Sequence, residues 1–145
     1  MENRPEVDVV GSNFYWAVEE EVGQKQILLP ENHEEIVQAL SKGNCICHPS
    51  VFFRKTRLLP FGPYKEGFGK GQDYYLWMSA RKSIRFHNLQ EPLLVKWYRS
   101  HPRQDLLMEY FINNMRIRIV GIKTAPNPIK DILNLPRCFK VFLQI

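Results

Sequence analysis

Long hydrophobic runs are missing from this sequence. Every apolar stretch is interrupted by Lys, Arg, Asp or Pro before it reaches the roughly 18 to 20 residues that a membrane-spanning helix needs. The acidic, Pro-containing start also lacks the apolar segment of a secretory signal. We therefore expect neither a membrane-spanning helix nor a secretory signal.

Cysteine is scarce as well. Cys45, Cys47 and Cys138 are the three cysteines, and an odd number leaves one unpaired in any disulfide scheme. Together with the missing signal, this favours a reducing, cytoplasmic setting. Cys45, Cys47 and His48 have the residue types of half a zinc site, but no second pair of ligands stands at a suitable spacing. Small buried thiols are the favoured interpretation.

Repeats and low-complexity segments are absent, and what is present is typical of a folded domain. The 145 residues, 44% of them hydrophobic and 12% aromatic, suffice for one domain with a buried core. Twenty Lys and Arg against fifteen Asp and Glu give a net charge of +5, which suits anionic partners such as nucleotide diphosphates or phospholipid surfaces. No helix-turn-helix, finger or aromatic platform is visible, so nucleic acid is not an expected partner.

The pattern of apolar residues predicts a mixed α/β fold. Alternation predicts strands at residues 7–10, 14–18, 50–54, 85–88 and 92–99. The first two strands are expected to join near Gly11. Helical periodicity predicts helices at residues 30–42, from Asp73 onward and at 104–123. Two prolines around Gly62 mark residues 58–64 as a turn-rich loop.

The predicted helix at residues 104–123 has one apolar stripe at helical spacing, formed by Met108, Phe111, Ile112, Met115, Ile119 and Ile122. Arg116, Arg118 and Lys123 lie off this stripe. One interpretation is a helix that covers the sheet and keeps its basic residues in solvent. The alternative is that residues 103–145 form a basic amphipathic helical extension that rests on anionic lipid, because a second basic and aromatic segment follows Pro128.

The stretch around Asp73 combines a flexible run with a helix start. Gly67, Gly69 and Gly71 come before it, and an apolar-periodic segment follows. An aspartate at this place has two alternative roles. It caps the helix by accepting the first backbone N–H groups, or a mobile loop delivers its carboxylate to a substrate. Trp77 falls on the apolar face of this helix and is expected in the core.

Four segments, in order, resemble one enzyme family. They are H-P-S-V-F-F-R-K at 48–55, F-G-P-Y at 61–64, G-Q-D-Y-Y-L-W at 71–77 and E-P-L-L-V-K-W-Y-R-S-H at 91–101. Together they are similar to the C-terminal half of family 2 glycosyltransferases of the GT-A fold, over residues 5–102. The resemblance implies a partial GT-A-like mixed sheet flanked by helices, with residues 1–102 as the acceptor-side half of the enzyme domain and a helical segment after it.

The resemblance also implies roles for the matched residues. The family's catalytic base, which takes the proton from the attacking acceptor hydroxyl in an inverting transfer, falls on Asp73. Gln72 stands where members commonly have an acidic residue, so no second carboxylate adjoins that base. Gly62 and Tyr64 fall on the loop near the acceptor. The late histidine that approaches the metal in many members falls on His101.

Other residues have alternative interpretations. Tyr75 is a candidate for facing the acceptor. Arg99 pairs either with a phosphate or with a nearby carboxylate such as Glu91. Without the resemblance, His101 is a surface histidine in a turn. His48 is expected to be structural, with its ring hydrogen-bonded within the sheet.

The implied activity is hexosyl transfer in the synthesis of a cell-envelope polysaccharide or glycoconjugate. It uses a nucleotide-sugar donor, a glycan or lipid-linked acceptor and Mn²⁺ or Mg²⁺, in the cytoplasm or peripherally at the inner face of the membrane. The family's N-terminal nucleotide-binding half and its Asp-x-Asp metal motif are not among these residues. We therefore expect the chain by itself to bind donor weakly and to be inactive. The competing hypothesis is a non-catalytic module that docks on an anionic membrane or a partner protein.

Overall fold

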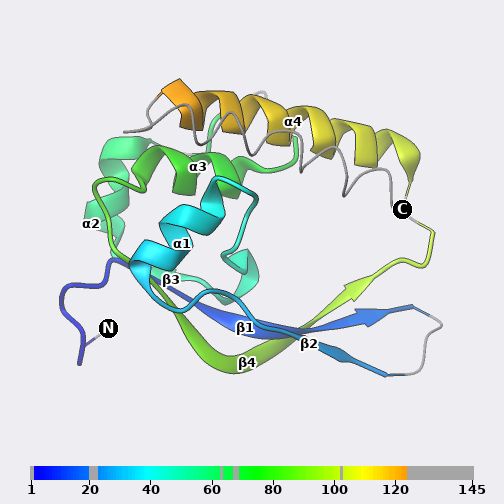
Figure 1. Ribbon diagram of the computed structural model, residues 1–145, viewed down its shortest axis with the longest axis horizontal. Coiled ribbons are helices and arrows are strands. Elements are labelled where there is room, and N and C mark those ends of the chain that lie inside the picture. Colours follow the sequence, from blue (N-terminus) through cyan, green and yellow to red (C-terminus); the bar gives the residue numbers. More distant parts are fainter. Residues whose placement is uncertain (1, 20–22, 63, 67–68, 102, 124–145) are drawn as a thin grey trace.

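The computed structural model describes residues 2–19, 23–62, 64–66, 69–101 and 103–123. In this part of the chain, a four-stranded mixed sheet carries the helices on one side (Figure 1). The predicted α/β class is confirmed, with a mixed sheet, flanking helices and a long helix at residues 104–123. None of the helices in the described ranges combines the length and hydropathy needed to cross a bilayer.

The strand β1 (Val9–Val18) takes part in every pairing of the sheet. β4 (Phe86–Tyr98) runs parallel to β1 along its whole length. β3 (Phe52–Phe53) and β2 (Lys25–Ile27) pair with it in the antiparallel sense, β3 near its start and β2 near its end. Because parallel neighbours need a long crossover connection, the segment between β1 and β4 contains α1 and the helices α2 and α3.

The strands predicted at 7–10 and 14–18 are one strand, and so are those predicted at 85–88 and 92–99. Gly11 does not make a turn. It leaves room for a neighbouring strand, because a Cβ there would collide with Oδ1 of Asn88. Pro92 lies opposite Asn13, where the register between β1 and β4 shifts, and proline is tolerated at such an irregularity.

The first helix and the strand after it are both shorter than predicted. α1 (His33–Leu40) begins after Asn32, which forms a capping box with Glu35. The strand expected at 50–54 is reduced to β3, because a 3₁₀ turn, η1 (His48–Ser50), precedes it and the helix α2 (Lys55–Leu58) follows. A second 3₁₀ turn, η2 (Leu59–Phe61), occupies part of the loop predicted at 58–64.

The helix α3 (Gln72–Ala80) forms the centre of the core. Trp77 is fully buried, as predicted, and its ring meets Phe86 edge-on with the ring centroids 6.2 Å apart. α4 (Gln104–Lys123) has the predicted bounds and packs against α3 (Figure 1). The core is therefore built from α3 outward, with β4 on one side and α4 on the other.

The buried face of α4 is not the predicted apolar stripe. Ile117 and Asn113 are buried, whereas Met108, Ile112 and Ile119 of the stripe are 42–55% exposed. Nδ2 of Asn113 donates to the backbone oxygen of Lys70 at 3.0 Å. The orientation of α4 is thus set by the loop before α3, a contact that helical periodicity does not reveal.

Arg118, predicted to lie in solvent, is buried next to Tyr74. The Tyr74 hydroxyl donates to the backbone oxygen of Leu40 at 2.5 Å, at the end of α1. Burial raises the pKa of Tyr74 to about 12, and the Arg118 charge opposes this shift. Tyr74 therefore links α1, α3 and α4 as a neutral phenol.

Candidate functional site

Asp73 lies in the first turn of α3, where the helix N-terminus favours negative charge. The residue that caps this helix is Gly71, which has a left-handed conformation with φ of 86°. The alternative role of Asp73 as the cap is therefore wrong. Its Oδ2 instead accepts a hydrogen bond from Nδ2 of Asn44 at 2.8 Å, and the side chain is half-buried.

Asn44 fixes the position of this carboxylate. Its own Oδ1 accepts the backbone N–H of Ile46 at 3.2 Å, so the amide group has one orientation and its NH₂ donates to Asp73. The sequence pattern did not single out Asn44, because an asparagine after a helix-ending glycine is typical of any loop. The available signal was an asparagine two residues before a buried apolar residue, the spacing of an Asx turn.

Tyr64 and His48 form a second polar pair of the site. The Tyr64 Oη and the His48 Nε2 are 3.2 Å apart, and the rings meet edge-on with centroids at 5.7 Å. Burial raises the pKa of Tyr64, and the negative charge of Asp73 adds to the shift. The Tyr64 hydroxyl therefore stays protonated at neutral pH. The expected position of His48 within the sheet is wrong, because His48 lies in η1.

The other residues predicted near the acceptor lie at or close to the start of α3. Gln72 is its first residue and is half-buried. Tyr75 is also half-buried, and its hydroxyl oxygen accepts a hydrogen bond from Nζ of Lys65 at 3.3 Å. The Lys65 ammonium also lies 4.9 Å from the centroid of the Tyr75 ring. Gly62 is exposed, with φ of 79°, at the end of η2.

Among the described residues, Arg99 and His101 have no contact with this group. Both are exposed on the segment between β4 and α4. The ion pairs in the described part of the chain join Arg57 to Asp8, Arg85 to Glu34 and Arg103 to Asp105. The suggested pair between Arg99 and Glu91 is not among them.

The described residues contain no group of three or more His, Cys, Asp or Glu side chains placed to hold a metal ion. Cys45 and Cys47 are buried free thiols, as predicted. Burial raises the pKa of Cys45 to about 12 and also raises that of Cys47. At neutral pH both are thiols, whereas metal binding needs thiolates. The metal role of His101 stays a prediction.

Comparison with known proteins adds one relative. The chain is 33% identical over 99 residues to the O-antigen biosynthesis glycosyltransferase WbnJ of Escherichia coli. The similarity covers 66% of this chain and 37% of that protein, so the chain spans little more than a third of its relative's length. No protein-family model matches the sequence, and no solved structure matches significantly. The similarity indicates a relationship to a glycosyltransferase, which agrees with the predicted enzyme class. Membership of family 2 and the GT-A fold stay predictions.

Proposed function

We propose that the chain is the acceptor-side part of an inverting family 2 glycosyltransferase in which Asp73 is the general base. The observation that supports this most strongly is the placement of the Asp73 carboxylate. It is half-buried at a helix N-terminus, held through one oxygen by Asn44, with the Tyr64 hydroxyl nearby. The similarity to a glycosyltransferase over 99 residues supports the same reaction class.

In this mechanism, the other carboxylate oxygen of Asp73 accepts the proton of an acceptor hydroxyl. The hydroxyl oxygen forms a bond to the anomeric carbon of the donor as the bond from that carbon to the nucleotide phosphate breaks, which inverts the configuration. An aspartate is ionised at neutral pH, and a positioned base contributes a factor of about 10² to 10⁴ in rate. Asn44 acts as a positioning residue, because its hydrogen bond orients the carboxylate without touching the acceptor.

The donor in this proposal is a nucleotide-sugar and the acceptor a glycan or lipid-linked sugar of the cell envelope. Bound Mn²⁺ or Mg²⁺ would neutralise the leaving diphosphate. Among residues of this chain, His101 is the proposed metal ligand and Arg99 the proposed phosphate contact. Most contacts to the donor belong to the remainder of the longer enzyme, since the chain aligns with only 37% of its relative.

The test is Asp73→Asn in a longer protein that includes the donor-binding residues. Transfer should fall by at least about 10², because the amide has no basic oxygen for the proton, while the fold is kept because the side chain retains its shape. Asp105→Asn is the matched control, since Asp105 is an exposed aspartate in the first turn of α4. Radiolabelled sugar transfer measures both. Turnover retained by Asp73→Asn would remove Asp73 from the mechanism.

A second candidate function is supported by the exposed side of α4. Its apolar side chains Met108, Ile112 and Ile119, which share one face by helical spacing, are 42–55% exposed. Arg116 on the same helix is also exposed. An amphipathic helix of this kind fits a peripheral contact with an anionic membrane surface. This contact is compatible with catalysis, or it is the whole function if the chain is a non-catalytic module.

A further inference from the structure

One side of α4 lies along the loop that leads into α3. Glu109, Asn113 and Ile117 stand four residues apart, so their side chains form one row on the helix surface. Along this row, the three side chains meet residues 69, 70 and 71 of the loop in the same order. The loop therefore runs beside α4 for about two turns of the helix.

The polar members of the row contact the backbone of the loop. The Glu109 carboxylate lies in the space that a Cβ at Gly69 would need. Nδ2 of Asn113 donates to the backbone oxygen of Lys70 at 3.0 Å. Asn113 is only 3% exposed, so little water competes for this hydrogen bond.

The row continues to the far end of α3. Gly121 stands four residues after Ile117, and its backbone oxygen accepts a hydrogen bond from Nη2 of Arg81 at 2.8 Å. Arg81 is the residue that ends α3. The helix α4 therefore holds α3 at both ends, through the loop before it and through Arg81 after it.

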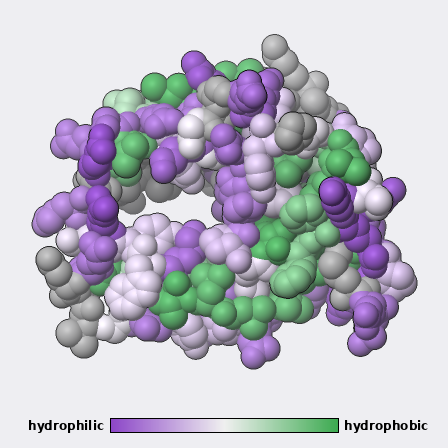
Figure 2. Space-filling view, turned by 180° about the vertical axis from the view of Figure 1, so that it is seen from behind, coloured by the Kyte–Doolittle hydropathy of each residue, from purple (hydrophilic) through white to green (hydrophobic). Residues whose placement is uncertain are grey.

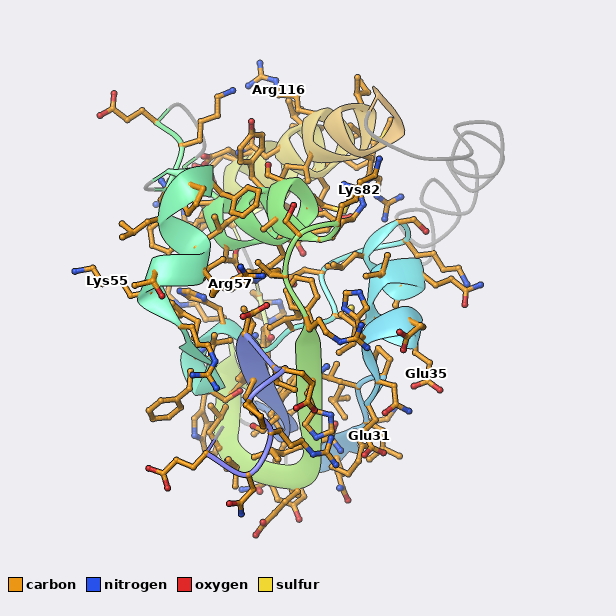
Figure 3. All side chains as sticks on the ribbon, turned by 90° about the vertical axis from the view of Figure 1, so that its left-hand side faces the viewer. Glu31, Glu35, Lys55, Arg57, Lys82 and Arg116 are labelled. Carbon is orange, nitrogen blue, oxygen red and sulfur yellow. The ribbon has the colours of Figure 1, made fainter. Side chains whose placement is uncertain are left out.

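Other sides of α4 face outward. Arg116 points away from α3 (Figure 3), and Met108 and Ile119 are 55% and 47% exposed. Figure 2 shows an opening between the helical layer and the sheet, whereas α4 packs against α3. The row is thus the side of α4 that meets the candidate site.

The loop held by this row determines where the proposed base stands. Gly71 caps α3 in a left-handed conformation, and Asp73 follows in the first turn. The Asp73 carboxylate itself accepts the hydrogen bond from Asn44. Two supports therefore act on Asp73: Asn44 holds the carboxylate, and the row of α4 holds the backbone that carries it.

We propose that Asn113 is a positioning residue of the candidate site, and that α4 belongs to the enzyme unit and is not a separate extension after residue 102. The hydrogen bond to Lys70 fixes how the chain enters α3 and thereby places the Asp73 carboxylate. This inference rests on the proposed function, because the group that is positioned is the proposed base. It adds a residue from outside the four segments that resemble the family.

The test is NMR of the isotope-labelled 145-residue chain with two matched variants. Asn113→Ala removes the hydrogen bond to the loop. Asn114→Ala is the control, because Nδ2 of Asn114 donates to the backbone oxygen of Tyr110 in its own helix, at 2.7 Å. The side-chain amide of Asn44 reports on the Asp73 carboxylate. Its signals should move in Asn113→Ala, in the direction that Asp73→Ala causes, and should stay in place in Asn114→Ala.

Hydrogen exchange separates positioning from general stability. The Tyr75 amide donates to the backbone oxygen of Gly71 at 2.9 Å, and the Ile36 amide makes the same first-turn bond to Asn32 in α1, also at 2.9 Å. In Asn113→Ala, exchange of the Tyr75 amide should rise at least about tenfold, because the loop loses its bond to α4. Exchange of the Ile36 amide should change less than about twofold.

A second variant keeps the test decisive if Asn113→Ala does not fold. Glu109 is half-buried, so the fold should persist in Glu109→Ala, which circular dichroism checks. Loss of this contact should raise exchange of the Tyr75 amide by about threefold. In a longer protein with the donor-binding residues, Asn113→Ala should lower kcat at least about tenfold and leave the KM for the donor unchanged.

Three results would overturn the inference. They are an unmoved Asn44 amide in Asn113→Ala, equal effects of the two asparagine variants, and equal rises in exchange at Tyr75 and Ile36. Any of them would reduce Asn113 to a general support of the fold. Failure of the proposed function is distinguishable, because it would leave the NMR results intact and appear as retained sugar transfer by Asp73→Asn.

Discussion

At the scale of single residues, Gly71 determines how the chain enters α3. Its φ of 86° lies in the left-handed region, which costs other residues roughly 1–2 kcal/mol. A Cβ there would also lie 3.3 Å from Cδ1 of Ile117. Because Asp73 follows two residues later, the glycine positions the proposed base and not only the helix.

Gly71→Ala should therefore lower the free energy of unfolding by about 1–2 kcal/mol, measured by urea denaturation. Gly43→Ala is the matched control, because the nearest atom to its added Cβ is Nη2 of Arg118 at 3.8 Å, an ordinary contact. Its effect should stay within about 0.5 kcal/mol. Equal losses in the two variants would contradict the assignment of strain to Gly71.

Tyr74 makes stability depend on pH in the alkaline range. Burial raises its pKa from 10.0 to about 12 in the folded protein, so the unfolded chain loses this proton first. The contribution of Tyr74 to the free energy of unfolding is fully present below pH 10. It is lost as pH rises through about 12, at about 1.4 kcal/mol per pH unit.

Tyr74→Phe should remove the contribution of this hydroxyl proton to the pH dependence of the unfolding free energy. Between pH 10 and 12, the plot of unfolding free energy against pH should become shallower by about 1.4 kcal/mol per unit, measured by denaturant titrations at several pH values. The comparison of slopes is independent of the hydrogen bond to Leu40 that the variant also loses. Identical slopes in the two proteins would show that Tyr74 does not stay neutral over this range.

The sequence predicted the candidate site only where a resemblance pointed to it. The resemblance gave Asp73 its predicted role as a base, and the structure places Gln72 and Tyr75 on the same helix. Asn44 was not found, because its role depends on a contact between a loop and the helix α3, which are far apart in sequence. The capping role of Asp73 was predicted wrongly because residue preferences at helix starts do not reveal that Gly71, two residues earlier, caps this helix.

At the scale of elements, α4 shows why periodicity predicts a helix better than its orientation. The predicted stripe contains Ile119, which is 47% exposed, and omits Ile117, which is fully buried. The helix packs through Ile117 and Asn113 because the loop before α3 offers the backbone oxygen of Lys70 as an acceptor to Asn113, and Gly71 leaves room for Ile117.

Ile117→Ala should thus lower the free energy of unfolding by about 2–5 kcal/mol through lost burial and a cavity. Ile119→Ala, a matched change in the same helix, should cost less than about 1 kcal/mol. Thermal and urea denaturation of both variants measure the difference. A larger loss from Ile119→Ala would support the orientation predicted from the apolar stripe.

β1 and β4 were predicted in the right places but each was divided in two, and β2 was not predicted. Gly11 and Pro92 are typical of strand ends, yet both lie inside long strands. Each marks a local requirement of the β1 and β4 pair: space for Asn88 at Gly11, and a register shift at Pro92. Such requirements exist only once the two strands meet, so a pattern read along one strand does not contain them.

At the scale of the whole molecule, the chain is basic and the surface is hollowed. The chain has a net charge of +5, and Figure 2 shows an opening between the helical layer and the sheet. The chain also spans little more than a third of the length of its relative. These features fit our expectation that the donor is bound mainly by residues outside this chain.

The membrane candidate is tested on the whole chain with vesicles containing anionic lipid. If α4 rests on the surface, binding should weaken steeply between low and physiological salt, because charge attraction is screened. It should be unchanged by Asp73→Asn. Vesicle sedimentation measures both, and neutral phosphatidylcholine vesicles are the control. Equal binding to neutral and anionic vesicles would contradict a role for the positive charge.

The parallel pairing of β1 with β4 has a consequence for how the molecule is made. Val9 pairs with Phe86, so a ribosome has already synthesised all of α1, α2 and α3 before the parallel neighbour of β1 exists. Pairings so distant in sequence slow folding, because the closure of a long loop comes before any gain from contacts. During that interval the apolar first strand has an open edge, and such edges promote aggregation. The nascent chain therefore depends on β4 to cover this edge and make β1 an interior strand of the sheet.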